Sequence, residues 1–304
     1  MRKAVIGIGS NSLRMLVADH ENGRLRTVLR SRVGLRVFAS LDSQLYIKPE
    51  MIRRISDAVN HMKLEALALH AETVHLFSTS AVRDAANQQE IIDRIAAETG
   101  LALQICSGVL EAKLSFLGAA GLSNSGMIDI GGGSTEIVIG EGEAIEFSAS
   151  IQAGAVRLYR EMPIENASDA DRVKAYVQNL ALELFPRIMK CKTPTVWVGV
   201  GGTMTAAAAY LQDVDWNTDQ GIEGYFVNRS ALQRAVVQLS GLSKEQRGAL
   251  RAIPQDRADI IVHGFVILLA YMELLNIRQI QVTQRTNLDG YLLAITTAES
   301  GSTA

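Results

Sequence analysis

A run of glycines in the middle of the chain is flanked by groups that could bind a phosphorylated ligand. The motif consists of an acid, a glycine turn, two hydroxyls and a second acid: Asp129, Gly131, Gly132, Gly133, Ser134, Thr135 and Glu136. Glycine lets a backbone approach a ligand closely, and successive N–H groups in such a turn form an anion-binding nest. Carboxylates are the ligands that hard cations prefer. The motif therefore predicts a metal-phosphate site, in which residues 131–135 bind phosphate and the two acids bind the metal.

The residues that follow this turn identify its class. A dinucleotide-binding loop joins a strand to a helix as G-x-G-x-x-G, and a Walker loop continues into Gly-Lys-Ser/Thr. Here residues 136–139 and 144–149 are typical of a β-branched strand, a turn and another strand. We therefore expect the glycine turn to join two strands of a hairpin, which excludes both of those nucleotide-binding classes.

The same pattern occurs at the start of the chain. Residues 4–17 also run as strand, small polar turn and strand, and the candidate phosphate ligands of this turn are Ser10, Asn11 and Ser12. Residues 6–9 overlay residues 128–131, with Gly7 at the position of Asp129. Two copies about 120 residues apart predict two related domains that face each other across a cleft, with a phosphate loop from each.

Three further stretches carry groups suited to an anion or to proton transfer. Residues 78–87 open a helix with hydroxyl residues and place Arg83 one turn in, and Glu111 shares a helix face with small residues. From these stretches alone, a solvated arginine and a surface glutamate are the more common outcomes. Residues 195–209 run as strand, glycine turn and alanine-rich helix, which directs a helix N-terminus at Gly201, Gly202 and Thr203.

The composition is that of an ordinary globular protein and excludes several classes of partner. The chain has 304 residues, 48% of them hydrophobic and 20% charged, and a net charge of −2, so it has no electrostatic footprint for nucleic acid. The longest apolar stretch, 260–269, is too short to span a bilayer, and the chain begins with a strand instead of a signal peptide. We therefore expect a cytoplasmic protein with no membrane contact, in which Cys106 and Cys191 are buried reduced thiols.

Strands alternate with helices outside the two hairpins, which predicts the α/β class with mixed sheets. Further strands are expected at 25–29, 74–77, 101–106, 195–200 and 279–283. Helices are expected at 49–70, 88–99 and 107–118, at 168–189 with a kink at Pro186, and at 229–239, 244–250, 254–275 and 288–296. His263, in the apolar helix, is expected to be a core residue with its hydrogen bonds satisfied.

Together these motifs resemble the exopolyphosphatase / guanosine pentaphosphate phosphohydrolase (Ppx/GppA) family. Residues 129–136 match its DIGGGSTE signature, 107–112 are similar to SGxxEA, 78–83 resemble TSAxR, and 6–12 resemble its first phosphate loop. The resemblance covers most of the chain, whose length is that of the short family members. It implies two ribonuclease-H-like domains of the actin, Hsp70 and sugar-kinase superfamily, with mixed sheets around an interdomain cleft. We place them at 1–120 and 121–304, with the last helix able to pack back on the first domain.

The resemblance also implies an activity. Family members release the terminal phosphate of polyphosphate or guanosine pentaphosphate, and the glutamate of SGxxEA, here Glu111, is the catalytic base. The two hairpin turns, the Gly201–Thr203 turn and Arg83 would then hold phosphate oxygens. Asp129 and Glu136 would hold Mg²⁺ or Mn²⁺, directly or through water. A homodimer is also expected from the resemblance.

Two positions depart from the family pattern. Gly7 stands where the family usually has the acid of IDxG, and residues 286–290 lack the arginine of a GLREG-like run. These departures motivate an alternative, a catalytically impaired protein that binds polyphosphate or (p)ppGpp. A gain of activity in Gly7→Asp would then show that the site is only impaired. A third hypothesis, an ATP-dependent kinase that uses residues 199–203 as a nucleotide loop, is disfavoured by the SGxxEA helix.

Overall fold

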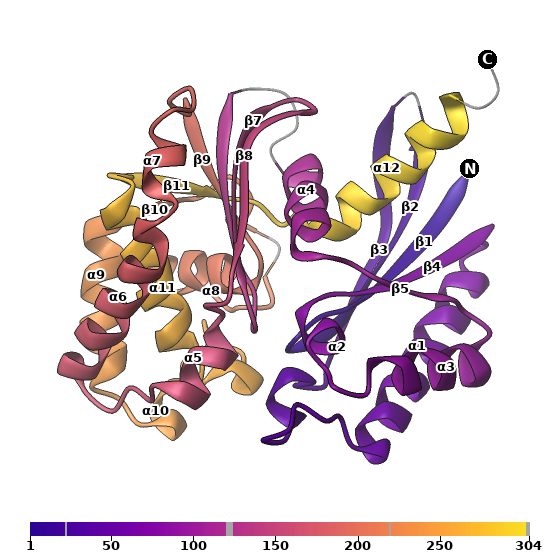
Figure 1. Ribbon diagram of the computed structural model, residues 1–304, viewed down its shortest axis with the longest axis horizontal. Helices are drawn as coiled ribbons and strands as arrows, with labels where there is room; N and C mark the ends of the chain where they lie inside the picture. Colours follow the sequence, from indigo (N-terminus) through magenta and orange to yellow (C-terminus); the bar gives the residue numbers. More distant parts are fainter. Residues whose placement is uncertain (22, 120–123, 219, 302–304) are drawn as a thin grey trace. The chain divides into compact units, whose positions relative to one another are not determined.

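The computed structural model of the chain describes residues 1–21, 23–119, 124–218 and 220–301 (Figure 1). The chain divides into two compact units, Met1–Gly118 with Asn287–Ala304, and Ala119–Thr286. The last helix, which the sequence analysis placed in the second domain while allowing it to pack on the first, is part of the first unit. No helix in the described ranges combines the length and apolar character that crossing a bilayer requires.

The first unit is built on a five-stranded mixed sheet with the strand order β3-β2-β1-β4-β5. Strands β1 to β3 are antiparallel, while β4 and β5 continue parallel to β1; they are Arg2–Ile8, Ser12–Glu21, Arg24–Gly34, Thr73–Ser78 and Leu103–Ile105. The helices are α1 (Pro49–Ala68), α2 (Ser80–Arg83), α3 (Gln88–Thr99), α4 (Gly108–Ala119) and α12 (Asn287–Gly301), with a short 3₁₀ helix, η1, at Phe38–Ser40.

Local sequence accounts for the two helices that pack on each other in this unit. Pro49 fits the first turn of α1 because its fixed φ suits a helix start and its missing N–H would be unpaired there. The apolar positions of α1 recur at helical spacing and are buried. Helix α3 ends at Gly100, whose φ of 68° is the left-handed conformation that glycine adopts easily. Both helices therefore form where the sequence predicted them.

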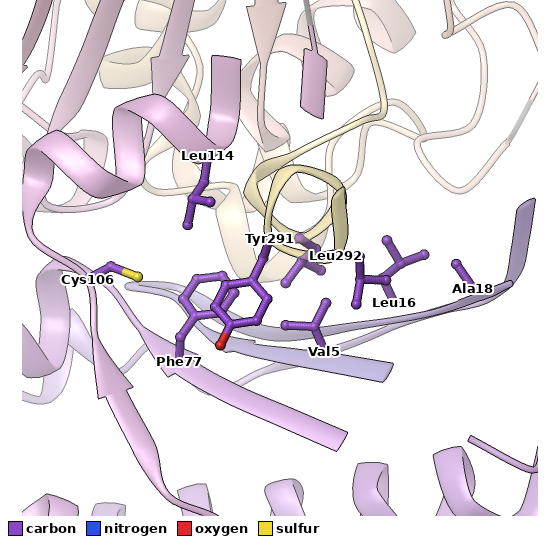
Figure 2. Close-up of a cluster of buried hydrophobic side chains, with 9 residues drawn as sticks. Val5, Leu16, Ala18, Phe77, Cys106, Leu114, Tyr291 and Leu292 are labelled. Atoms are coloured by element: carbon purple, nitrogen blue, oxygen red, sulfur yellow. The ribbon is translucent and has the colours of Figure 1, made fainter. Parts of the chain in front are cut away.

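An apolar cluster joins the sheet of the first unit to α4 and α12 (Figure 2). Its buried members come from β1, β2, β4, the residue that follows β5, and the two helices: Val5, Leu16, Ala18, Phe77, Cys106, Leu114, Leu288, Tyr291 and Leu292. The rings of Phe77 and Tyr291 stack with their centroids 5.1 Å apart. Gly290 packs so closely on the carbonyl of Leu114 that a Cβ there would collide with it. The packing fixes the first turn of α12 against the sheet.

The second unit has a six-stranded mixed sheet with the order β10-β11-β9-β6-β7-β8. Its strands are β6 (Ser125–Ile130), β7 (Thr135–Glu141), β8 (Ala144–Ile151), β9 (Val196–Val200), β10 (Phe226–Asn228) and β11 (Gln279–Val282). Strands β6 to β8 are antiparallel and β9 and β11 are parallel to β6. Read from β8, this arrangement repeats that of the first unit: three antiparallel strands followed by two parallel ones. Strand β10 has no counterpart in the sheet of the first unit, and no sequence pattern predicted it.

Helix α11 (Ile261–Leu274) is the core helix of the second unit, and almost all of its residues are buried. It packs against α5 (Ala155–Glu161), α6 (Ala167–Leu182), α8 (Gly202–Gln212) and α9 (Arg229–Ser240). The remaining elements are α7 (Phe185–Ile188), α10 (Lys244–Gly248) and the 3₁₀ helix η2 (Gln255–Arg257). The mixed α/β class expected from the sequence is therefore confirmed for both units.

Two expected helices and one thiol differ from the structure. The helix expected at 168–189 is two helices, because Pro186 lies in the first turn of α7 instead of kinking α6, and the N-cap of α6 is Asn166. The helix expected at 254–275 begins only at residue 261, after η2. Cys106 is buried as expected, whereas Cys191 is only half-buried.

His263 on α11 makes folding stability sensitive to acid. Its Nε2 lies 3.0 Å from the carbonyl of Met162 and its ring meets Tyr159 edge-on. Burial is the main cause that lowers the pKa of His263 from 6.5 to about 4, and repulsion from Arg247 adds to it. A base with a lowered folded-state pKa stabilises fully above its unfolded pKa and loses stability as pH falls from 6.5 toward 4.

We expect this loss to reach roughly 2–3 kcal/mol at pH 4.5. Urea unfolding of the wild type and of His263→Gln at pH 7.5 and pH 4.5 measures it, since glutamine stays neutral and can still donate to Met162. Carboxylates titrate equally in both proteins, so the difference isolates the histidine. Equal losses in the two proteins would contradict the prediction.

Candidate active site

The glycine turn of the second unit presents main-chain N–H groups on one side. It joins β6 to β7 as expected, and the N–H of Gly131 donates to the carbonyl of Ser134 at 2.9 Å. The carbonyls of Gly131 and Gly132 accept N–H groups from the first turn of α5. The N–H groups of Gly132, Gly133 and Ser134 find no acceptor among the described residues. Three such donors in succession form the nest that the sequence predicted for phosphate.

The hydroxyls of this turn differ in what they contact. Ser134 Oγ is buried and has no hydrogen-bond partner within the described chain. Thr135 Oγ1, by contrast, donates to the carbonyl of Ala153 at 2.6 Å. Thr135 therefore ties the turn to the segment that leads into α5, and Ser134 is the hydroxyl left to meet a ligand.

Gly154 allows the turn to lie directly on the start of α5. A Cβ at this position would collide with the carbonyl group of Gly132, although the backbone itself has φ −98°, which any residue adopts. We expect Gly154→Ala to displace the turn, to destabilise the protein by about 1–3 kcal/mol, and to lower phosphate release. The matched control is Gly241→Ala, where the nearest atom would lie at 3.6 Å. Wild-type thermal unfolding and activity in Gly154→Ala would refute this packing argument.

The turn of the first unit has the same construction. The N–H of Gly9 donates to the carbonyl of Ser12 at 3.1 Å, as Gly131 does to Ser134. The carbonyls of Ser10 and Asn11 accept N–H groups from the segment that follows β3: Leu35, Arg36 and Phe38. Ser10 Oγ lies 2.6 Å from Ser80 Oγ at the start of α2. In both hairpins, carbonyls of the turn thus accept hydrogen bonds from a neighbouring segment. Other N–H groups of each turn remain for a ligand.

Arg83 and Glu111 form a buried ion pair in the first unit. Arg83 Nη1 lies 2.9 Å from Glu111 Oε2 and 3.1 Å from the carbonyl of Cys106. The side chains are only 17% and 9% exposed, so neither the solvated arginine nor the surface glutamate is found. Arg83 Nη2 is buried without a hydrogen-bond partner within the described chain. The pair places a carboxylate, a group that can act as a general base, beside a donor that can bind an anion.

Cys106, whose carbonyl helps to hold Arg83, has a thiol with no part in this chemistry. Burial raises its pKa to about 12, and the negative charge of Glu111 adds to the effect. A thiol with so high a pKa is not a nucleophile at neutral pH. Its role is to pack in the apolar cluster of the first unit.

The two acids of the glycine motif lie next to each other in the second unit. Asp129 and Glu136 are register partners on β6 and β7, and Ser150 Oγ on β8 donates to Glu136 Oε1 at 2.7 Å. Glu136 is buried and Asp129 is half-buried. Tyr271 on α11 is also close, since burial and the charge of Glu136 both raise the pKa of its hydroxyl. No sequence motif predicted Ser150 or Tyr271 at this place.

These acids suit one kind of cation. The described residues contain no cluster of three or more His, Cys, Asp or Glu side chains that could enclose a metal. Mg²⁺, however, is usually bound by one or two carboxylates and completes its shell with water and substrate phosphates. The carboxylates of Asp129 and Glu136 therefore fit Mg²⁺ or Mn²⁺, and Asp129 is the more exposed of the two.

The third predicted turn, between β9 and α8, is arranged differently from the expectation. Gly201, with φ 91°, is the N-cap of α8, and a Cβ there would lie 2.8 Å from Asp129 Oδ1. Thr203 directs its side chain at Gly264 of α11 and is buried. The guanidinium of Arg257 covers Gly202 so closely that a Cβ there would collide with it. The turn therefore offers main-chain groups and the charge of Arg257, while the hydroxyl of Thr203 faces the core.

The predicted site residues thus fall into two groups. Those in the first unit are Ser10, Asn11, Ser12, Arg83 and Glu111, and the others are in the second unit. Within their units, Arg83 contacts Glu111, Ser10 contacts the start of α2, and Asp129 lies beside both Glu136 and the Gly201 turn. Arg257 is a further functional candidate, which the sequence motifs did not predict.

Comparison with known proteins agrees with the motifs. The model of the Ppx/GppA phosphatase family matches residues 16–298. The chain belongs to this family. Among curated Ppx/GppA relatives, exopolyphosphatase 2 of Mycobacterium tuberculosis is 32% identical over 97% of this chain and 98% of its own length. The guanosine-5'-triphosphate,3'-diphosphate pyrophosphatase of Vibrio vulnificus is 27% identical over 90% of this chain and 55% of its own length.

Solved Ppx/GppA structures share the fold. An exopolyphosphatase from Cytophaga hutchinsonii superimposes with a TM-score of 0.88 and 23% identity over 98% of both chains. The Aquifex aeolicus family member gives a TM-score of 0.83, also with 23% identity and 98% coverage of both chains. At this identity the likeness supports the two mixed α/β units and nothing finer.

Proposed function

We propose that this Ppx/GppA protein is a phosphoanhydride hydrolase that releases the terminal phosphate of inorganic polyphosphate or guanosine pentaphosphate. Family membership gives the hydrolase class, and the names of the relatives give the two substrates. The observation that carries the proposal is the largely buried pair of Arg83 and Glu111, which places a carboxylate beside an arginine nitrogen that has no hydrogen-bond partner within the described chain. Burying two charges costs free energy, and groups of this kind are concentrated at functional sites.

The residues divide the reaction between them. In the first unit, the N–H groups of the Ser10 turn and Arg83 Nη2 bind phosphate oxygens, and in the second unit the N–H groups of the glycine turn bind them. Glu111 accepts a proton from the attacking water, whose oxygen forms the new bond to phosphorus. The bond from that phosphorus to the bridging oxygen breaks, and the shortened chain or nucleotide leaves with the bridging oxygen. A Mg²⁺ or Mn²⁺ ion held by Asp129 and Glu136 would neutralise the charge of the phosphate oxygens.

One observation favours the alternative, a protein that binds polyphosphate or (p)ppGpp but does not hydrolyse it. Gly7 stands where the second hairpin has Asp129, so the two hairpins do not carry equal sets of acids. The anion-binding turns would be intact in such a protein while hydrolysis would fail. The kinase hypothesis has less support, because Arg257 covers Gly202 at the turn that it assigned to a nucleotide.

Phosphate release from polyphosphate, guanosine pentaphosphate and ATP, in a series of Mg²⁺ and Mn²⁺ concentrations, separates these possibilities. We expect release from at least one of the first two substrates and little from ATP. Binding of polyphosphate by calorimetry without release from either substrate would support the impaired binder instead. We also expect a cytoplasmic homodimer, which light scattering of the purified protein and fractionation of the producing cells will test.

A further inference from the structure

The two hairpins differ in one row of residues next to the turn. The pair that flanks the turn is Ile8 with Leu13 in the first hairpin and Ile130 with Thr135 in the second. The next pair outward is Gly7 with Arg14 in the first and Asp129 with Glu136 in the second. Register partners project from the same face of a sheet. The row that carries two carboxylates in the second unit therefore carries a glycine and an arginine in the first.

The place of the missing carboxylate is filled by apolar side chains. A Cβ at Gly7 would lie 2.9 Å from Leu288 Cδ2 and 3.2 Å from Phe77 Cζ. Both side chains are buried members of the cluster in Figure 2, where the ring of Phe77 lies against Tyr291. An aspartate at position 7 would thus displace Leu288 and place its charge against the apolar side chains of Leu288 and Phe77.

The first turn of α12 has little freedom to make room. Asp289 receives two hydrogen bonds from Arg30 on β3, one of them at 3.1 Å. Gly290 lies so close to the carbonyl of Leu114 that α12 cannot move toward α4 without a steric clash. Leu288 directly precedes these two anchors. Position 7 is therefore shaped by Phe77 of β4 and by a leucine about 280 residues further along the chain.

The register partner of Gly7 is Arg14 on β2, which pairs in turn with Arg32 on β3. The row beside Gly7 therefore holds basic residues where the second unit has Glu136.

We propose that Gly7 and Leu288 are a matched pair that closes the first hairpin to divalent cations, so that metal binding is confined to Asp129 and Glu136 and the first hairpin binds phosphate oxygens without a metal. This inference rests on the proposed function. It changes one expectation from the sequence: Gly7→Asp by itself should not increase activity, because the new carboxylate has no room.

A double-mutant cycle tests the matched pair. Gly7→Asp and Leu288→Ala should each lower the thermal midpoint, and the double variant should lose clearly less than the sum, because the smaller side chain leaves room for the aspartate. The control cycle combines Gly7→Asp with Leu292→Ala, a buried leucine of the same helix and cluster that is not among the nearest neighbours of a Cβ at Gly7. We expect additive losses there. Equal additivity in both cycles, or a Gly7→Asp variant as stable as the wild type, would overturn the proposal.

Mn²⁺ titration followed by electron paramagnetic resonance tests where the cation binds. We expect one bound Mn²⁺ per wild-type chain, at least a tenfold loss of affinity in Asp129→Asn, and no additional Mn²⁺ in Gly7→Asp. Two bound ions in the wild type, no bound ion, or one retained by Asp129→Asn would each contradict the assignment. Failure of the proposed function would appear separately, as absent phosphate release with these stability and titration results unchanged.

Discussion

Replacing Glu111 with glutamine is expected to lower phosphate release by about 10²–10⁴-fold, which is the usual contribution of a positioned general base. Glutamine keeps the size of the side chain and can still accept the hydrogen bond of Arg83 Nη1, now 2.9 Å from Glu111 Oε2. It cannot accept a proton from water. The measurement is the initial rate of phosphate release from polyphosphate, with the thermal midpoint recorded for the same sample.

The affinity for substrate, unlike the rate, should not fall in this variant. Removing a negative charge next to Arg83 frees the guanidinium to interact with phosphate oxygens, so we expect Glu111→Gln to bind polyphosphate at least as tightly as the wild type. Calorimetry measures this without turnover.

The matched control is Glu98→Gln. Glu98 also pairs with an arginine, Arg94, at 2.8 Å, but both side chains are about one-third exposed on the surface of α3. An exposed pair of this kind contributes little to stability, so this variant should keep the wild-type rate and thermal midpoint. If Glu111→Gln retained the full rate while folded, the role of Glu111 as base would have to be given up.

Replacing Asp129 with asparagine is the second large effect that we expect. Asparagine keeps the shape of the side chain and removes its charge, so the divalent ion loses its more exposed carboxylate. A metal in such a site contributes several kcal/mol of charge stabilisation, and we expect a loss of about 10²-fold or more at fixed Mg²⁺. The dependence of the rate on Mg²⁺ concentration should shift to higher concentrations as well.

Glu136 provides an internal comparison for this prediction. It is buried and accepts a hydrogen bond from Ser150, so its influence on the metal passes through water or through the position of β7. Glu136→Gln should therefore reduce the rate less than Asp129→Asn does. The surface control is Asp171→Asn, whose side chain is 78% exposed. An unchanged Mg²⁺ dependence in Asp129→Asn would show that this residue does not hold the ion.

The hairpins and most helices were predictable because their signals are local. Alternating β-branched residues around a glycine turn define β6 and β7 with their register, and Gly100 marks the end of α3. The same holds for the phosphate turns, since the capacity to expose N–H groups is a property of the turn itself. Local signals were less decisive at prolines: Pro186 lies in the first turn of a new helix, where the sequence predicted a kink.

The parts of the candidate site that were not predictable depend on contacts distant in sequence. The sequence shows that Gly7 lacks a carboxylate, but only the fold shows that Leu288 fills the place. Periodicity does not reveal that Thr203 turns its hydroxyl to Gly264 or that Arg257 covers Gly202. The ion pair of Arg83 with Glu111 is of the same kind, because two ordinary surface residues in the sequence become a buried pair through the packing of α2 and α4.

A crystal structure of the protein with bound phosphate tests the central claim most directly. We expect phosphate oxygens within hydrogen-bond distance of the main-chain N–H groups of Gly132, Gly133 and Ser134, and others at the Ser10 turn and at Arg83 Nη2. Phosphate bound elsewhere, with both hairpin turns empty at a saturating concentration, would contradict it.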